Sequence, residues 1–213
     1  MDFHEVRRRW AERTGEYSPE YYAYYGPNET SETIRRLADR YVGRDAAVLE
    51  LGCSSGRHLS HLHDDGFENL AGVEINADAI DVMREHYPDL ADDGTFYLEP
   101  IEDVVRDFED GQFDVVYSVE TLQHLHPDLE WVFEELVRIT GDLLVVVENE
   151  GENGDETGSE GTSAASDVDV KYVDDGVPLY FRDWNRIFTE LGLREVDRSS
   201  DGRDIVRAFR PRG

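Results

Sequence analysis

The chain of 213 residues has one cysteine, Cys53, one lysine, Lys171, and no long apolar run. A single cysteine excludes an intrachain disulfide. The longest apolar run, Leu143 to Val147, is far too short to span a bilayer, which takes about 20 residues. Residues 3–10 are rich in charge and lack the apolar core of a targeting segment. We therefore expect a cytoplasmic protein without a membrane segment.

Basic side chains are scarce. Lys and Arg total 21 against 49 Asp and Glu, and the formal net charge is −28. The acidic residues are spread through every helical segment. Such a composition suits a protein that must stay soluble in concentrated salt, where self-repulsion is screened, so it predicts a halophilic protein. It also disfavours nucleic acid as a partner, because a phosphate backbone needs a basic track.

Segments with the apolar spacing of a strand alternate along the chain with segments that have the apolar spacing of a helix. The expected strands cover residues 47–51, 70–74, 95–98, 113–118, 142–148, 193–196 and 205–209, and ordered structure is expected to resume at residues 168–173. The expected helices cover residues 3–10, 34–41, 57–64, 80–87, 129–137 and 184–191, with Asp128 and Asp183 capping the last two. This alternation predicts an α/β fold, a doubly wound sheet with helices on both faces, in a single domain of residues 1–213.

Two segments differ from this pattern. Residues 1–40 contain Trp10 and a tyrosine cluster between Tyr17 and Tyr25. Two interpretations of these aromatics stay open: they form a cap that encloses a substrate, or they complete the core over the sheet edge. Residues 149–167 have hardly an apolar side chain. They cannot offset their ordering entropy by burial, so we expect a mobile acidic loop.

A glycine-bearing turn follows the first expected strand. The stretch from Val48 to Gly56 reads VLELGCSSG, an apolar run with an acid and then a turn that leads into a helix. Gly52 permits the sharp turn, and Gly56 is expected to let ligand and helix approach without a Cβ between them. The dinucleotide pattern G-x-G-x-x-G would place its later glycines on Ser54 and Arg57. This mismatch argues against a nicotinamide-dependent oxidoreductase and for a ligand without a diphosphate.

The stretch resembles motif I of the class I S-adenosylmethionine (SAM)-dependent methyltransferases, with Ser54 in place of the middle glycine. Two later segments extend the resemblance over about residues 46–148: LAGVEIN from Leu70, and QFDVVYSVETLQHL from Gln112. The resemblance implies SAM as cofactor. It also implies a seven-stranded, mostly parallel sheet of order 3-2-1-4-5-7-6 with an antiparallel last strand.

The resemblance also implies which residues bind the cofactor. Glu74 would accept hydrogen bonds from both ribose hydroxyls, and Ile101 and Glu102 would bracket the adenine. Glu99 and Pro100 replace the family's common Gly-Asp pair. The full expected set is Glu50, Gly52, Cys53, Ser54, Gly56, Glu74, Ile75, Ile101, Glu102 and Ser118. Within this set, Cys53 is expected to be a small packing residue and not a nucleophile.

The acceptor is expected to be a small molecule methylated on O, N or C. Ser118 to Thr121 replaces the Asn/Asp-Pro-Pro-aromatic tetrad of amide and exocyclic-amine methylases, which disfavours that class. The alternatives are a SAM-binding module without turnover and a nucleic-acid or protein methyltransferase. Oligomeric state is left open.

Methyl transfer needs alignment more than acid–base chemistry. Glu120 and His124 follow the fourth strand and are the candidate catalytic residues; His124 either takes a proton near neutral pH or packs. Arg57 either neutralises the SAM carboxylate or pairs with neighbouring acids.

No metal site is expected, because the spacing of His58, His61 and His63 (i, i+3, i+5) does not put all three on one helical face.

Overall fold

The computed structural model describes residues 1–151, 169–173 and 176–212. Its main sheet has seven strands in the order β3-β2-β1-β4-β5-β9-β8. Their bounds are β1 Ala47–Leu51, β2 Asn69–Glu74, β3 Thr95–Leu98, β4 Phe113–Val119, β5 Thr140–Glu148, β8 Leu193–Asp201 and β9 Asp204–Pro211. Counted within this sheet, the order is the predicted 3-2-1-4-5-7-6. The strands from β1 to β5 pair in parallel, and β9 is antiparallel to both β5 and β8, which confirms the predicted fold.

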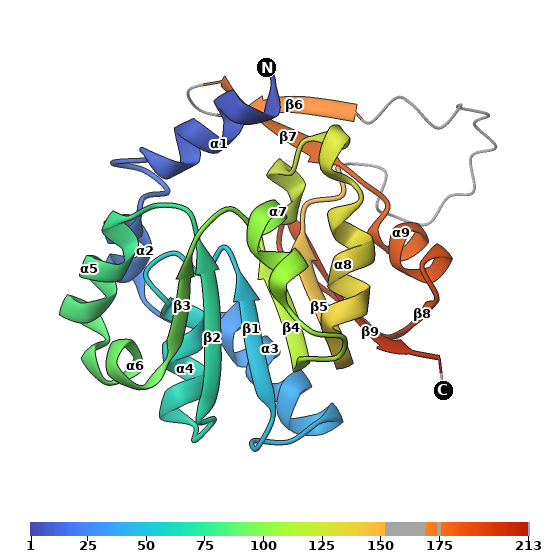
Figure 1. The fold of residues 1–213 in the computed structure, drawn as a ribbon, viewed down its shortest axis with the longest axis horizontal. Helices are drawn as coiled ribbons and strands as arrows, with labels where there is room; N and C mark the ends of the chain where they lie inside the picture. The colour runs from blue at the N-terminus through green and yellow to red at the C-terminus, as the bar shows by residue number, and fades with distance from the viewer. Residues whose placement is uncertain (152–168, 174–175, 213) are drawn as a thin grey trace.

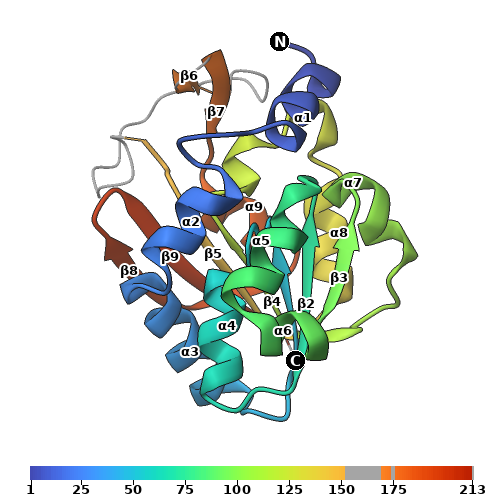
Figure 2. The same ribbon diagram turned by 90° about the vertical axis from the view of Figure 1, so that its left-hand side faces the viewer.

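Helices cover both faces of the sheet (Figure 2). Their bounds are α1 Phe3–Ala11, α2 Pro19–Tyr25, α3 Glu29–Tyr41, α4 Arg57–Asp64, α5 Asp78–His86, α6 Pro88–Asp93, α7 Ile101–Val104, α8 Val132–Ile139 and α9 Trp184–Glu190, with 3-10 turns η1 Val105–Asp107, η2 Leu122–His124 and η3 Pro127–Leu129. One core cluster joins the sheet to α7, α8 and α9, and the other joins it to α3, α4, α5 and α6. The central strands are apolar on both sides because both sides are covered.

The carboxyl ends of the parallel strands lie beneath α1 (Figure 1). A separate hairpin lies at the same end and contacts α1; it is formed by β6 Asp169–Val173 and β7 Val177–Phe181. In contrast, α3 belongs to the core, where Ile34, Leu37 and Ala38 are buried against α4 and the sheet. The segment above the strand ends is therefore α1 and α2, shorter than the predicted cap of residues 1–40.

Two local predictions were wrong, and one strand was missed. Asp128 does not cap a helix: it lies in η3, and α8 begins only at Val132 after an uncapped Trp131. The strand β7 was not predicted. The acidic loop does not begin at residue 149, because the buried Glu150 accepts hydrogen bonds from Arg207 at 2.6 and 2.9 Å. Residues 152–167 of that loop lie outside the described residues.

Within the described ranges, no helix combines the length and the apolar character that crossing a bilayer demands.

Candidate active site

One cavity opens at the carboxyl ends of β1, β2 and β4, below α1 and α2. This is where open α/β sheets bind ligands. Segments far apart in the sequence contribute to its wall. The lining residues used below are Phe3, Val6, Arg7, Trp10, Arg13 and Tyr22 from the N-terminal segment, Glu50, Gly52, Cys53, Ser54, Arg57 and His58 around the first turn, Glu74, Ile75, Asn76, Ile101 and Glu102 after β2 and β3, and Glu120, Thr121, His124 and Leu125 after β4.

The turn after β1 has the tight shape that its glycines predict. Gly52, Ser54 and Gly56 adopt positive φ angles of +70°, +48° and +81°. A Cβ on Gly52 would lie 2.3 Å from Oγ1 of Thr121, so glycine is required there both by conformation and by space. Ser54 tolerates a conformation that costs a non-glycine residue roughly 1–2 kcal/mol.

Gly56 does not approach the ligand space, contrary to the prediction. A Cβ at this position would lie 2.9 Å from Cε of Met83 and 2.9 Å from Cδ2 of Leu90. Gly56 is absent from the cavity lining. Its role is to let the turn pack against α5 and α6, and the cofactor contact assigned to it does not follow from this geometry.

Cys53 is a packing residue. It is buried, and a Cβ on Gly72 would lie 2.6 Å from its Sγ. Burial raises the pKa of its thiol.

Glu74 connects the end of β2 to this turn. Its Oε2 accepts the backbone N–H of Ser54 at 2.7 Å, and its Oε1 accepts those of Ile75 and Asn76 at 2.7 and 2.8 Å. A carboxylate has about four acceptor positions, so these bonds leave about one for a ribose hydroxyl. Bidentate binding of the ribose diol would displace a backbone bond. Burial raises the pKa of Glu74, while the three N–H donors act against that shift.

Glu50 lines the cavity from β1. It is fully buried, and its Oε2 accepts the hydroxyl of Tyr117, its register partner on β4, at 2.9 Å. Burial raises the pKa of this carboxyl to about 8, against the opposing effects of the Tyr117 hydroxyl and of the Arg57 charge. A buried acid facing a cavity is stabilised in its charged form by a ligand cation. Glu50 therefore suits the ammonium group of an amino-acid-bearing ligand.

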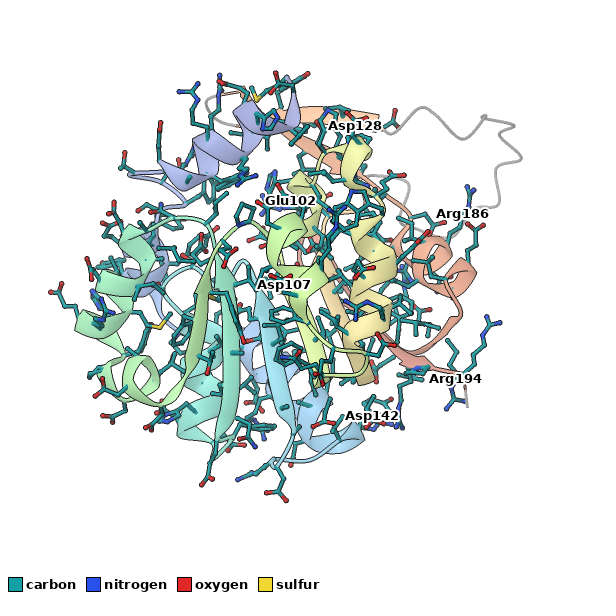
Figure 3. The ribbon with its side chains drawn as sticks, viewed as in Figure 1. Glu102, Asp107, Asp128, Asp142, Arg186 and Arg194 are labelled. Atoms are coloured by element: carbon teal, nitrogen blue, oxygen red, sulfur yellow. The ribbon has the colours of Figure 1, made fainter. Side chains whose placement is uncertain are left out.

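The expected adenine segment lies at the beginning of α7. Ile101 and Glu102 both line the cavity, and Figure 3 shows Glu102 below α1. Nη1 of Arg7 lies 3.5 Å from Glu102 Oε1, and Nη2 lies 3.0 Å from Asp103 Oδ2. On the other side, the Asn76 amide donates to the carbonyl of Arg13 at 3.1 Å. These contacts attach the N-terminal segment to the two segments after β2 and β3.

Ser118 is absent from the residues that line the cavity, and its assignment as a cofactor contact does not follow from this geometry. It is buried, and its hydroxyl donates to Glu148 Oε1 at 2.6 Å. The wall is formed instead by the residues that follow it, including Glu120 and Thr121. Side chains alternate faces along a strand, so an assignment one residue too early places the group on the opposite side.

Glu148, at the end of β5, was missed by the sequence analysis. Besides the Ser118 hydroxyl, it accepts the backbone N–H groups of Thr121, Leu122 and Gln123 at 3.3, 3.0 and 3.2 Å. Burial raises the pKa of Glu148 to about 7, although the hydrogen bonds from these donors act to lower it. The carboxylate thus fixes the chain after β4. A signal existed, since Glu148 ends a buried strand as Glu74 does.

The two candidate catalytic residues both line the cavity. Glu120 has a positive φ of +50° and is ion-paired with Arg203 from the β8–β9 turn. His124 lies 4.7 Å from the Trp10 ring, and its Nδ1 lies 2.9 Å from the carbonyl oxygen of Pro178. A carbonyl only accepts, so Nδ1 carries the proton and Nε2 is an acceptor, which the side-chain amide nitrogen of Gln123 contacts at 3.5 Å. Burial lowers the pKa of His124 to about 4; the expected pKa near neutrality was wrong.

The histidines of α4 have separate environments. His58 is buried beside Ser31, whereas His61 contacts Glu32 and His63 contacts Asp93. Arg57 has no carboxylate within ion-pair distance among the described residues, so pairing with neighbouring acids does not explain it.

The sheet is doubly wound, and its cavity lies between a glycine turn and a carboxylate at the end of β2. These features define a Rossmann-like protein for a nucleoside-containing ligand. Comparison with known proteins makes this specific. Residues 49–142 match a family model described as a methyltransferase domain. The Escherichia coli O-antigen chain terminator bifunctional methyltransferase/kinase WbdD is 32% identical over 89 residues, which cover 40% of this chain and 12% of that protein.

Solved structures agree over nearly the whole chain. The CcbJ methyltransferase from Streptomyces caelestis matches with a TM-score of 0.65 at 20% identity, covering 98% of this chain and 96% of that one. The Burkholderia thailandensis 1,6-didemethyltoxoflavin-N1-methyltransferase, with bound 1,6-didemethyltoxoflavin and S-adenosylhomocysteine (SAH), matches with a TM-score of 0.63 at 14% identity, covering 98% and 83%. Residues 49–142 thus resemble a methyltransferase domain, and the fold of the chain is that of these solved methyltransferases. The chain's matches span only 12% to 37% of the curated relatives' own lengths.

Proposed function

We propose that the protein transfers the methyl group of SAM to an O, N or C atom of a small molecule held beneath α1 and α2. The observation that carries this proposal is the composition of the cavity wall. Glu50 and Glu74 lie on its sheet side, and Phe3, Val6 and Trp10 lie on its outer side. A polar floor for the cofactor and an apolar, aromatic roof for the acceptor therefore share one space.

The residues fit SAM at several points. Glu74 retains an acceptor position for a ribose hydroxyl, and Glu50 is a buried acid without a paired cation among the described residues. Bound SAM would supply an activated methyl group on its sulfonium. The roof of α1 would exclude water and hold the acceptor in line with it, which is the main requirement of such a transfer.

Two residues of the cavity wall can orient a polar methyl acceptor. Trp10 Nε1 is buried without a hydrogen-bond partner among the described residues, so it suits an acceptor atom on the substrate. His124 is neutral, and its Nε2 can accept a proton or a hydrogen bond from the nucleophile. The bound 1,6-didemethyltoxoflavin of the Burkholderia neighbour supports a small-molecule substrate. The net charge of −28 supports a small molecule over nucleic acid.

The test is methyl transfer from isotope-labelled SAM into a small-molecule metabolite extract, followed by mass spectrometry. Labelled product in the extract, and none with protein or RNA as acceptor, is the expected result. SAM binding measured by calorimetry without transfer to any fraction would identify a binding module instead. Deletion of residues 1–14, which removes α1 and leaves α2 with its cap Ser18, should abolish transfer while the fold and SAM binding persist. The halophilic and cytoplasmic assignments remain proposals based on composition.

A further inference from the structure

Arg57 is an unusual arginine in this chain. It is the first residue of α4 and lines the cavity. Elsewhere, arginines such as Arg35 and Arg138 each pair with two carboxylates, as expected when acids exceed bases by 49 to 21. Among the described residues, Arg57 donates one hydrogen bond, from Nε to Nε2 of His58 at 3.2 Å, and pairs with no acid.

The position of Arg57 is unfavourable for a structural role. The amino end of a helix carries a partial positive charge, so a cation is disfavoured there. Its guanidinium lies 4.6 Å from the centroid of the Tyr22 ring, a cation–π contact. With one face on Tyr22 and Nε on His58, the terminal nitrogens are left for a ligand. A guanidinium presented in this way matches a carboxylate with two parallel hydrogen bonds.

His58 is fixed by a chain of hydrogen bonds. Its Nδ1 lies 2.7 Å from Oγ of Ser31, and both residues are buried. Ser31 belongs to the capping box of α3: its Oγ accepts the backbone N–H of Asn28 at 3.0 Å and donates to Asn28 Oδ1 at 3.3 Å. Since Nε2 accepts from Arg57, Nδ1 must carry the proton and donate to Ser31. Burial lowers the pKa of His58 well below its usual value, in agreement with a neutral ring.

We propose that His58 is a positioning residue which, held by Ser31, orients Arg57 to bind a carboxylate in the cavity. This inference rests on the proposed function, because it concerns the same cavity. Arg57 and Glu50 both line this cavity, so a positive and a negative side chain act on the same ligand space. The ammonium and carboxylate of an α-amino acid match that pair. The carboxylate therefore belongs to the amino-acid end of the cofactor or, as the second source, to an acidic substrate.

Two ligands that differ by the amino-acid end test the first source. SAH carries the carboxylate, whereas 5′-methylthioadenosine lacks the whole amino-acid portion, and calorimetry with each needs no substrate. Arg57→Gln and His58→Leu should weaken SAH about 10- to 100-fold, the usual effect of a lost charged hydrogen bond, and leave methylthioadenosine unchanged. His58→Gln, which keeps an acceptor and a donor, should restore most of the SAH affinity. His63→Gln is the control, because His63 lies on the same helix and pairs only with exposed Asp93.

The second source is tested on protein saturated with SAH. If variants at Arg57 and His58 bind SAH normally but lose binding of benzoate relative to benzamide, the carboxylate is that of a substrate. Equal losses for SAH and methylthioadenosine would overturn the proposal, because they would indicate a general defect of the turn. Unchanged binding of all probes would also overturn it. Circular dichroism of each variant identifies any that fails to fold. A lack of methyl transfer by the unaltered protein would refute the proposed function but not this binding result.

Discussion

The Glu74 carboxylate accepts the backbone N–H of Ser54 at 2.7 Å, so the last residue of β2 holds the turn that follows β1. The same side chain also holds the chain after β2 through Ile75 and Asn76. Glu74 thus shapes the cofactor site before any ligand binds. We propose that Glu74 contacts the ligand in addition to organising the two loops.

Replacing this carboxylate should therefore impair binding. Glu74→Gln removes one acceptor and presents an N–H to backbone donors, so SAH affinity should fall about 10- to 150-fold. Calorimetry measures the change. Glu68→Gln, an exposed acid just before β2, is the matched control. Equal affinity of both variants would contradict the assignment of Glu74.

Cofactor binding should release a proton near neutral pH. The pKa of Glu50 is raised to about 8 by burial, so at pH 7 the free protein holds this carboxyl mostly protonated. A ligand ammonium favours the charged form and lowers that pKa. Titration of SAH in buffers of different ionisation enthalpy should show release of up to about one proton at pH 7 and less above pH 8. Glu50→Gln should abolish it, and a proton release that persists in this variant would assign the titration elsewhere.

The stability of the protein should also depend on Glu50. Its folded pKa lies above the usual value of 4.5, so the folded state binds the proton more tightly than the unfolded chain. Its contribution to stability is therefore complete below about pH 4.5 and is lost as pH rises through 8. In the Glu50→Gln variant, the fall in the free energy of unfolding between these pH values should be smaller.

Gly56 should matter for packing and not for ligand space. Gly56→Ala adds a Cβ 2.9 Å from Met83 and Leu90, whereas Gly202→Ala adds one with no neighbour within 4 Å; both positions have positive φ. The second variant should lose about 1–2 kcal/mol from backbone strain, and the first should lose more because of overpacking, typically about 1–3 kcal/mol. Urea denaturation measures both. Equal losses would show that the neighbours of Gly56 yield without cost.

Ser118→Ala should leave SAH affinity within about twofold. Its hydroxyl donates to Glu148 and does not line the cavity, so the variant should lose about 0.5–1.5 kcal/mol of stability. A large loss of SAH affinity with unchanged stability would restore Ser118 as a cofactor contact.

Concentrated salt should stabilise the protein. With 49 acids against 21 bases, repulsion within the folded state is large at low ionic strength and is screened at high ionic strength. The melting temperature should rise between dilute buffer and molar KCl. Equal stability at both salt concentrations would remove the basis for a halophilic assignment.

The sheet could be predicted because its signals are local. Short, mostly apolar runs such as residues 48–51 predict strands whichever neighbours they pair with. A glycine turn after such a strand predicts the edge of the sheet at which ligands bind. Glu74 followed from its place at the end of the second run. The strand β7 did not, because Val177 to Phe181 contains Pro178 and is a strand only through its pairing with β6.

The rest of the site depends on register and on contacts between distant segments. The side of a strand end that faces the cavity is set by pairing with the neighbouring strands, which the local sequence does not show. The strand β4 lies between β1 and β5, with Ser118 beside Leu51 and Val146. For this reason the sequence analysis assigned Ser118 to the cavity wall. Likewise, nothing local to Glu148 reveals that it holds four donors from another segment. The His58–Ser31 contact joins residues 27 positions apart in sequence, and only the packing of α3 on α4 creates it.

The roof of the cavity is attached at both sides to its floor, through Arg7 with Glu102 and Asp103 and through the Arg13 carbonyl with Asn76. A donor molecule seated between Glu74 and Ile101 would lie beneath these attachments. From this arrangement we expect the donor to load before the acceptor, and we expect spent donor to leave only when these contacts break. We therefore expect each cycle to include one opening of the N-terminal segment, with the strength of these few polar contacts limiting the rate of product release.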